Sequence, residues 1–361
     1  MPLAEIWTMG IAAPKIAADA AIRAEAAGFD GMLVVDSQNL AGDPYVGLAL
    51  AARATARLRL GTGVTNPATR HPAATAAAIA SVQVASDGRA VLGIGRGDSA
   101  LAHLGSAPVP AELLEHYVIT VRAFLRGERV PFAELQRYMP PSVRPIGSLG
   151  LADAPDASTM TWLPRDVSPV PVEVAATGPR ALALAALHAD RVMLAVGADP
   201  VRVAWAIERV RAVRRDAGLD PAGVLIGAYL NVVCHPDVDT ARALVAGGLA
   251  TFARFSVMDG HVRTPVDETQ QRVLSDLHNA YDMTHHTEAG SSQAGRLTAD
   301  FIDRFGIVGS TEVCVSRLSE IGALGVDRFV VTGPSPGADR NAAREATARF
   351  VNEVMPELRA G

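Results

Sequence analysis

The chain of 361 residues is predicted to fold as a (β/α)8 barrel, the TIM-barrel class of α/β proteins. Short apolar runs alternate with helical stretches along the chain, and eight such pairs suit a barrel of this length. The apolar runs lack polar alternation, which is typical of parallel strands buried on both faces. We therefore expect residues 1–361 to form a single barrel domain.

The predicted elements follow one another in a regular order. The eight strands are expected at residues 5–11, 31–35, 58–60, 90–94, 170–175, 191–195, 224–233 and 328–331. Helices are expected between or before them, and the one that starts at Pro72 has proline in its first turn, as helices tolerate. The helices cover residues 16–27, 44–56, 72–86, 111–125, 179–188, 200–217, 238–253 and 311–324.

Two insertion segments break this rhythm. Residues of about 133–169 are rich in Pro, Ser, Asp and Arg, and residues of about 255–305 contain clustered polar side chains. Long loops in a compact domain are usually functional or disordered. By position the insertions follow strands four and seven. We expect both on the face formed by the strand C-termini, where barrel active sites lie.

Composition excludes several classes of function. The net charge is −5 with acids and arginines well mixed, which argues against a nucleic-acid surface. Lys15 is the only lysine. Cys234 and Cys314 lie too far apart for a metal motif or a disulfide framework. No signal peptide and no apolar run of about 18 residues is evident. We expect a cytoplasmic protein with no nucleic-acid or membrane partner.

Two strands end in the same way, in glycines followed by polar residues. The sequence GTGVTN covers residues 61–66, and GRGDS covers residues 95–99. Glycine allows a flat ring or a phosphate to approach the backbone closely. Thr65, Asn66, Asp98 and Ser99 add side-chain hydrogen bonds. The same residues would also serve as turns and helix caps.

Two further segments carry chemistry. Ala176, Thr177 and Gly178 form a small-residue loop directly before Pro179 opens a helix, which suits an anion such as phosphate. Asp36 follows the second predicted strand. A carboxylate there can be an acid/base group, a cofactor contact or only a cap for the next loop.

Together these segments resemble the luciferase-like monooxygenase superfamily. The matching stretches are GTGVTNPATRHPA, AVLGIGRGDSALAHLG, VEVAATGP and FGIVGSTEVCVSRLSEIGALGVDRFVV. The branch that they resemble contains methylenetetrahydromethanopterin reductase, which uses the deazaflavin coenzyme F420. The resemblance covers the chain from Met9 to about Gly333 and covers the two insertions least.

The resemblance implies a role for each matching residue. A non-prolyl cis peptide would join Gly63 and Val64 behind the cofactor ring, and Asn66 would lie near the polar edge of the ring. Residues 95–98 would lie against cofactor and substrate, and residues 176–178 would bind phosphate. The predicted catalytic residues are Asp36 and Asp98, and the predicted cofactor-binding residues are Gly63, Val64, Thr65, Asn66, Gly95, Arg96, Gly97, Ala176, Thr177 and Gly178.

The chain departs from a deazaflavin-dependent sugar-phosphate dehydrogenase of the same superfamily. That enzyme has His after the rim acid, where this chain has Ser37. It also has Lys in the loop after strand six, where this chain reads Gly197, Ala198 and Asp199. A sugar-phosphate substrate is therefore not expected.

The predicted function is hydride transfer between coenzyme F420 and a small organic substrate, in which the cofactor supplies the hydride chemistry. One alternative is an FMN-dependent monooxygenase that uses O2 and a separate flavin reductase. Another is a cofactor-binding barrel without catalysis. A homodimer is expected, because the family uses barrel helices for dimer contacts and helix 72–86 carries small residues that permit close packing. The same small residues would serve packing within one chain.

Three other features leave alternatives open. His278, Asp282, His285 and His286 form a polar cluster that suits a substrate lid or a solvated loop, and no metal site is predicted. Trp162 would either cover a ring or anchor its insertion. The remaining pair, Arg70 and His71, would either neutralise cofactor charge or cap and pair locally.

Overall fold

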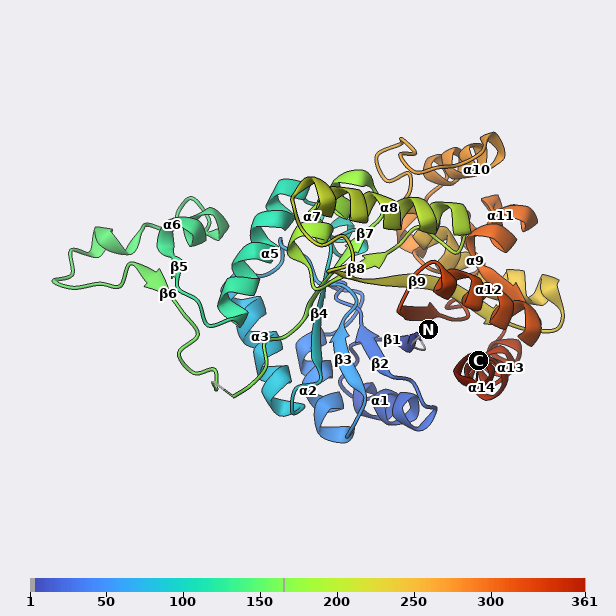
Figure 1. The fold of residues 1–361 in the computed structure, drawn as a ribbon, viewed down its shortest axis with the longest axis horizontal. Coiled ribbons are helices and arrows are strands. Elements are labelled where there is room, and N and C mark those ends of the chain that lie inside the picture. The colour runs from blue at the N-terminus through green and yellow to red at the C-terminus, as the bar shows by residue number, and fades with distance from the viewer. Residues whose placement is uncertain (1–3, 165, 361) are drawn as a thin grey trace. The chain divides into compact units, whose positions relative to one another are not determined.

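A computed structural model describes residues 4–164 and 166–360 as a barrel of parallel strands with helices between them (Figure 1). The strands pair in the order β1-β2-β3-β4-β7-β8-β9-β11, and β11 pairs with β1, which closes the barrel. The predicted TIM barrel is confirmed. The strands are β1 (Glu5–Gly10), β2 (Gly31–Val34), β3 (Arg59–Thr62), β4 (Ala90–Ile94), β7 (Val172–Ala176), β8 (Arg191–Leu194), β9 (Leu225–Cys234) and β11 (Arg328–Thr332).

The helices begin at local signals that the sequence provides. Asp43, Asp199 and Asp237 each accept backbone N–H groups at a helix start, and proline opens several first turns. All eight predicted helices are present, with ends within two residues of the predicted ones. They are α1 (Ala17–Ala26), α2 (Pro44–Ala54), α3 (Pro72–Ala85), α5 (Ala111–Leu125), α7 (Pro179–His188), α8 (Pro200–Asp216), α9 (Val238–Arg254) and α12 (Thr311–Ala323). Helical turns also cover residues 340–360 as α13 (Arg340–Arg349), a π-helical turn (Phe350–Val354) and α14 (Met355–Ala360).

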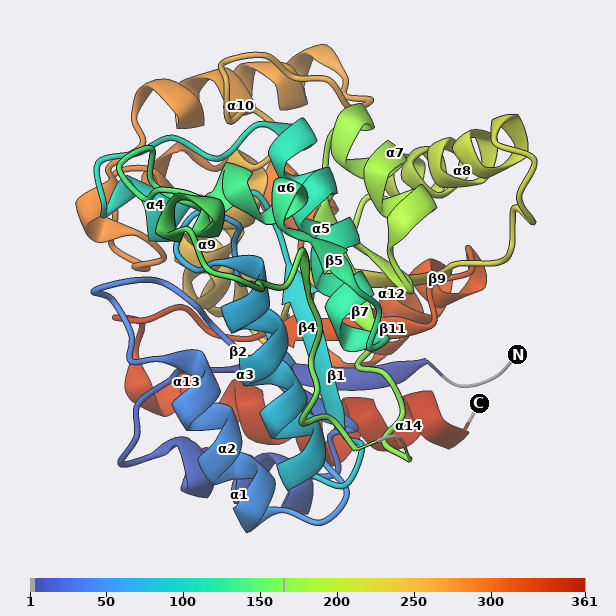
Figure 2. The same ribbon diagram turned by 90° about the vertical axis from the view of Figure 1, so that its left-hand side faces the viewer.

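Contacts divide the chain into two compact units, which are described separately below. Of the described residues, the first unit contains 4–9, 23–33 and 173–360, and the second contains 10–22, 34–164 and 166–172. In the second unit, α2 and α3 lie side by side next to β3 and β4 (Figure 2). Small buried residues of α3, such as Ala76 and Ala80, allow this close packing. These two alanines therefore contribute to packing within one chain.

The second insertion belongs to the first unit and contains α10 (Glu268–Asn279) and α11 (Ala299–Phe305). Gly247 of α9 lets it approach, because a Cβ there would lie 2.4 Å from the backbone of Thr287 and Glu288. The insertion ends in β10 (Ile307–Gly309), which pairs with the last residues of β9. The insertion thus follows α9 and not β9 directly, which differs from the expectation, but its last residues return to the C-terminal end of β9.

The first insertion differs from the expectation. It follows α5 rather than β4, because α4 (Ser99–Ala102) and α5 come first, so it connects a helix to the start of the next strand. It forms α6 (Phe132–Leu135) and a short antiparallel pair of β5 (Val130–Pro131) and β6 (Ala157–Ser158), and it extends away from α5 (Figure 1). Only its early part returns toward the strand C-termini, where Tyr138 packs edge-on against His71 at the start of α3.

A buried cluster of charged residues lies at the strand starts of the first unit. Glu173 accepts hydrogen bonds from both Arg191 and Arg328, and all three side chains are at most 7% exposed. Arg328 also donates to Glu5 at 2.6 Å and lies 3.9 Å from the centre of the Trp7 ring. Burial and the nearby Arg328 cation lower the pKa of Arg191 to about 10. Glu173 is thus the buried anion that two buried cations share, while the partly exposed Asp327 and Glu5 pair with Arg191 and Arg328 respectively.

Removing that anion tests its structural role. We expect Glu173→Ala to lower the free energy of unfolding by about 3–5 kcal/mol, because the two buried arginines then keep only the partly exposed carboxylates of Asp327 and Glu5 as partners. The matched control is Glu320→Ala, which removes a half-exposed carboxylate 3.6 Å from Arg317 and should cost less than about 1 kcal/mol. Denaturant titration measures both, and equal losses would contradict the assigned role.

Candidate functional site

The C-terminal ends of β2, β3 and β4 meet in the second unit and are joined by hydrogen bonds. The Thr65 backbone N–H donates to the Gly93 carbonyl at 2.9 Å, and the Gly95 N–H donates to the Thr65 carbonyl at 2.9 Å. The Thr65 hydroxyl donates to Asp36 at 2.6 Å. The structure therefore brings together the predicted residues that follow these three strands.

Asp36 is the centre of this arrangement. Its side chain is 1% exposed, and its two carboxylate oxygens accept three side-chain hydrogen bonds. Gln38 Nε2 donates to Oδ1 at 2.6 Å, whereas Thr65 Oγ1 and Arg70 Nη1 donate to Oδ2 at 2.6 and 2.8 Å. Burial of a carboxylate is costly unless its oxygens accept hydrogen bonds, and these three donors supply them. This set of bonds favours a positioning role for Asp36 over proton transfer.

Arg70 connects Asp36 to the start of α2. Its Nη2 donates to Asp43 at 2.7 Å, and its guanidinium lies 4.9 Å from the centre of the Tyr45 ring. Burial disfavours the Arg70 cation, but Asp36 and Asp43 outweigh this effect and raise its pKa. Of the two roles considered for Arg70, the structure shows local pairing.

His71 has a structural role at the start of α3. Its Nδ1 accepts the Ala73 backbone N–H at 3.2 Å, so that nitrogen carries no proton. Burial lowers the pKa of His71, which keeps the ring neutral. The predicted capping alternative therefore applies to His71.

The peptide bond between Gly63 and Val64 is cis, as predicted. The Gly63 N–H donates to the Val34 carbonyl at 2.8 Å, which fixes the end of β3 against the end of β2. Both residues are partly exposed next to buried Thr65. They are available to a ligand at the ends of these strands.

Asn66 and Gly97 pack closely against each other. Asn66 is fully buried, and its Oδ1 accepts the N–H groups of Ala68 and Thr69 at 3.0 and 3.1 Å. Within the described residues its Nδ2 has no hydrogen-bond partner. Gly97 has a φ of +77°, and a Cβ there would lie 2.9 Å from Leu101 and 3.1 Å from Asn66. Only glycine fits this position.

Asp98 and Arg96 flank Gly97 in the loop after β4. Asp98 is the half-buried residue before α4, and its side chain makes no capping hydrogen bond to that short helix. Arg96 is exposed, and its Nε donates to the Val109 carbonyl at 2.6 Å. The Val109 N–H in turn donates to the Arg96 carbonyl at 3.0 Å, so the loop at 106–110 is fixed to the end of β4.

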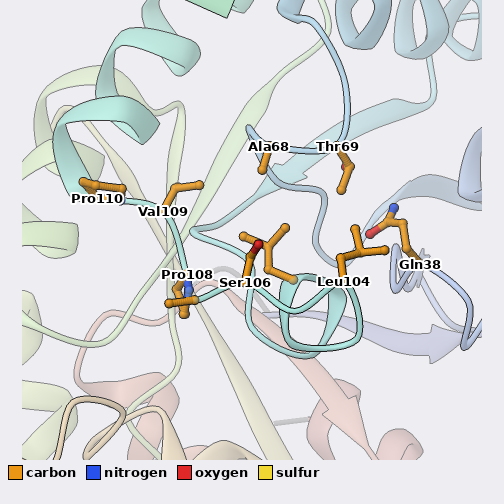
Figure 3. Close-up of a pocket in the computed structure, with 10 residues that line it drawn as sticks. Gln38, Ala68, Thr69, Leu104, Ser106, Pro108, Val109 and Pro110 are labelled. Atoms are coloured by element: carbon orange, nitrogen blue, oxygen red, sulfur yellow. The ribbon is translucent and has the colours of Figure 1, made fainter. Parts of the chain in front are cut away.

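A cavity of about 500 Å³ lies beside this network within the second unit (Figure 3). The volume is in the range of small-molecule sites. Gln38 was not among the predicted site residues, although a polar residue two positions after Asp36 was a signal. The lining residues are Gln38, Ala68, Thr69, Leu101, Leu104, Ser106, Ala107, Pro108, Val109 and Pro110.

The predicted phosphate loop lies in the first unit, where β7 ends in Ala176 and α7 begins at Pro179. Gly178 precedes the helix, no side chain caps this helix start, and no atom lies within 4 Å of the position that a Gly178 Cβ would take. The Thr177 hydroxyl donates to the Ala195 carbonyl at 3.2 Å. The open helix start suits an anion, and its phosphate contact stays a prediction.

The polar cluster of the second insertion is held by local hydrogen bonds. His285 Nδ1 lies 2.7 Å from Asp282, and His286 Nδ1 lies 2.9 Å from the Tyr281 hydroxyl. Over residues 4–164 and 166–360, the structure shows no group of three or more His, Cys, Asp or Glu side chains that could hold a metal ion. Trp162 is 48% exposed on the first insertion, so it does not anchor that segment in the core.

Gly97→Ala tests the close packing beside Asn66. We expect it to destabilise the protein by about 1–3 kcal/mol more than Gly105→Ala, because its Cβ would displace Leu101 or Asn66. Gly105 is the matched control, since its φ is +74° and no atom would contact its Cβ within 4 Å. Denaturant unfolding of both variants measures the difference, and equal losses would show that only the backbone conformation matters.

Comparison with known proteins places these features in a family. The family model described as luciferase-like monooxygenase matches residues 4–328. A 5,10-methylenetetrahydromethanopterin reductase of Methanolobus tindarius is 29% identical over 317 residues, which are 86% of this chain and 88% of that protein. The reductase of the same name from Archaeoglobus fulgidus is 27% identical over 93% of both chains.

Solved structures share the fold. The coenzyme F420-dependent tetrahydromethanopterin reductase of Methanopyrus kandleri is 22% identical with a TM-score of 0.72, over 99% of this chain and 100% of that one. An F420-dependent secondary alcohol dehydrogenase, solved in complex with an F420-acetone adduct, is 19% identical with a TM-score of 0.68, over 99% of both chains. Given the family match over most of its length, the chain belongs to the luciferase-like monooxygenase family.

Proposed function

We propose that this protein is a coenzyme F420-dependent oxidoreductase that transfers a hydride between F420 and a small organic substrate. The observation that carries the proposal is its similarity, over 86% and 93% of the chain, to two 5,10-methylenetetrahydromethanopterin reductases. A reductase of that class with this fold is named as coenzyme F420-dependent. The F420-dependent hydroxymycolic acid dehydrogenase of Mycobacterium tuberculosis is 31% identical over 55% of this chain and 52% of that protein, which adds support.

The residues of the second unit fit a flat ring with polar edge groups. Asn66 Nδ2 is a buried donor without a partner among the described residues, and a ring carbonyl would satisfy it. Gly63 and Gly97 have no side chains to obstruct the approach of a ring. When bound, F420 supplies a ring carbon that accepts or releases the hydride. Gly63, Val64, Thr65, Asn66, Gly95, Arg96 and Gly97 are the residues that we propose hold it.

Asp36 and Asp98 have different proposed tasks. Asp36 orients Gln38, Thr65 and Arg70, because its oxygens are already occupied by their donors. Asp98 is half-buried and directly follows the glycines after β4 that we propose lie against the ring, so we assign it the proton transfer that accompanies hydride transfer. In alcohol oxidation the substrate carbon loses a hydride and the substrate oxygen loses a proton, and Asp98 would take that proton. Thr177 and Gly178 are proposed to contact the cofactor phosphate.

The alternative use of FMN and O2 is not favoured by these relatives. Monooxygenases do share the fold, and one example is the EDTA monooxygenase of Chelativorans, with a TM-score of 0.65. At 14% identity this likeness concerns the fold alone. A cofactor-binding barrel without catalysis is not favoured either, because the relatives named above are reductases and dehydrogenases.

A homodimer is proposed as the assembled form. Helix α3 contains no charged residue, and neighbouring α2 and α3 expose Val46, Leu50 and Val84 by 49, 41 and 39%. Such an apolar surface suits a second copy of the chain.

Sedimentation should give twice the monomer mass, and Leu50→Asp should shift the mass to that of a monomer. A monomeric wild-type protein would contradict this assembly.

None of the described helices is long and apolar enough to cross a membrane.

The catalytic assignment is tested by following the absorbance of oxidised F420 with a panel of alcohols, and of reduced F420 with aldehydes and ketones. We expect Asp98→Asn to lower the rate by about 10²–10⁴-fold, the usual contribution of a general acid or base, while F420 still binds. Asp87→Asn, at an exposed turn before β4, is the matched control and should retain the rate.

The outcomes separate the parts of the proposal. Full turnover by Asp98→Asn would remove the proton-transfer role of this residue but not the use of F420. Failure of every substrate class to change F420, together with oxygen consumption in the presence of FMN and a flavin reductase, would overturn the F420 assignment.

A further inference from the structure

We propose that the cavity beside Asp36 binds an uncharged molecule that carries an O–H or N–H donor, recognised by Gln38 Oε1 and Thr69 Oγ1. The inference rests on the proposed function only for the statement that this molecule is the substrate, which would then be a neutral alcohol in its reduced form. The binding preference itself follows from the cavity.

The cavity wall excludes a charged ligand. None of its ten lining residues is charged, and only Gln38, Thr69 and Ser106 are polar. Two arginines lie near the wall without lining it. Arg70 already donates to Asp36 and Asp43, and the exposed Arg96 donates through Nε to the carbonyl of the lining residue Val109. An anion in this cavity would lose hydration without gaining a positively charged side chain on the wall, and the buried Asp36 carboxylate lies nearby.

The orientation of the Gln38 amide is fixed by its partner. Asp36 Oδ1 is an acceptor, so the amide group 2.6 Å away must present its NH2 to it. The amide oxygen then points the other way, toward Leu104 (Figure 3). Gln38 Oε1 is buried and receives no hydrogen bond from residues 4–164 and 166–360. Gln38, which lines the cavity, therefore carries an acceptor that needs a donor.

Thr69 provides the second unsatisfied polar atom. Its backbone N–H donates to Asn66 Oδ1 at 3.1 Å, which fixes the loop, while its hydroxyl is buried and has no partner among the described residues. A hydroxyl can both donate and accept. An alcohol can thus donate to Gln38 and accept from Thr69, whereas a ketone can only accept.

This difference predicts selectivity between the two oxidation states. A ketone leaves Gln38 Oε1 without a partner, and one missing hydrogen bond corresponds to about a tenfold loss of affinity. A carboxylate should bind more weakly than either, because it is charged. The cavity therefore favours the alcohol over the ketone of the same carbon skeleton.

The test uses the purified protein without coenzyme, so that it does not depend on F420 turnover. Dissociation constants of cyclohexanol, cyclohexanone and cyclohexanecarboxylate are measured by ligand-observed NMR titration. We expect cyclohexanol to bind about tenfold more tightly than cyclohexanone, with the carboxylate weakest. Equal affinities, a preference for the ketone or carboxylate, or no binding of any probe would overturn the proposal.

Variants locate the effect. Gln38→Met keeps the side-chain length and should abolish the preference for the alcohol, whereas Gln271→Met, at an exposed position of α10, should retain it. Thr69→Val replaces the hydroxyl by a methyl group of similar size and should weaken the binding of cyclohexanol. Thr69→Ser keeps a hydroxyl and should retain the affinity for cyclohexanol. If Gln38→Met does not fold, the comparison of Thr69→Val with Thr69→Ser still tests the proposal. Unchanged cyclohexanol affinity in Thr69→Val would place the alcohol elsewhere and overturn the assignment.

Discussion

The candidate site depends on one constraint, the burial of the Asp36 carboxylate. A carboxylate that is 1% exposed must have its oxygens satisfied, and Gln38, Thr65 and Arg70 do so. These donors come from the loop after β2, the end of β3 and the segment before α3. One buried charge thereby fixes the relative positions of three loops and sets the direction of the Gln38 amide.

The two units use buried charge in different ways. At the strand starts of the first unit, Glu173 joins Arg191 and Arg328 in a buried cluster of charged side chains. At the strand ends of the second unit, the Asp36 network leaves Gln38 Oε1 and Asn66 Nδ2 with unused hydrogen-bonding capacity within the described residues. The first arrangement stabilises the fold, and the second prepares atoms for a ligand.

Much of the fold was predictable, because buried parallel strands are continuous apolar runs and the helices carry proline and aspartate at their starts. The strand at Ala90–Ile94 and the helix at Ala111–Leu125 have the predicted ends. The resemblance also predicted the cis peptide bond between Gly63 and Val64, which the structure contains. The path of the first insertion was not predictable, since its Pro-rich sequence has no periodicity, and Tyr138 returns to His71 through a contact between distant segments.

The site was predicted in part. The sequence placed Asp36, Thr65, Asn66 and the glycines after β4 together, because the ends of neighbouring parallel strands share one face. It did not predict that Arg70 would reach back 34 residues to Asp36, or that this pairing would occupy the carboxylate. Side-chain partners of this kind depend on rotamers and loop packing, and a single sequence carries no period or spacing that reports them.

The most direct test of the account is the affinity of the purified protein for F420 and for FMN, measured by fluorescence quenching in parallel titrations. The account predicts a micromolar or lower dissociation constant for F420, which is about −8 kcal/mol or better, and far weaker binding of FMN. A preference for FMN would contradict it and would assign the protein to oxygen-dependent chemistry.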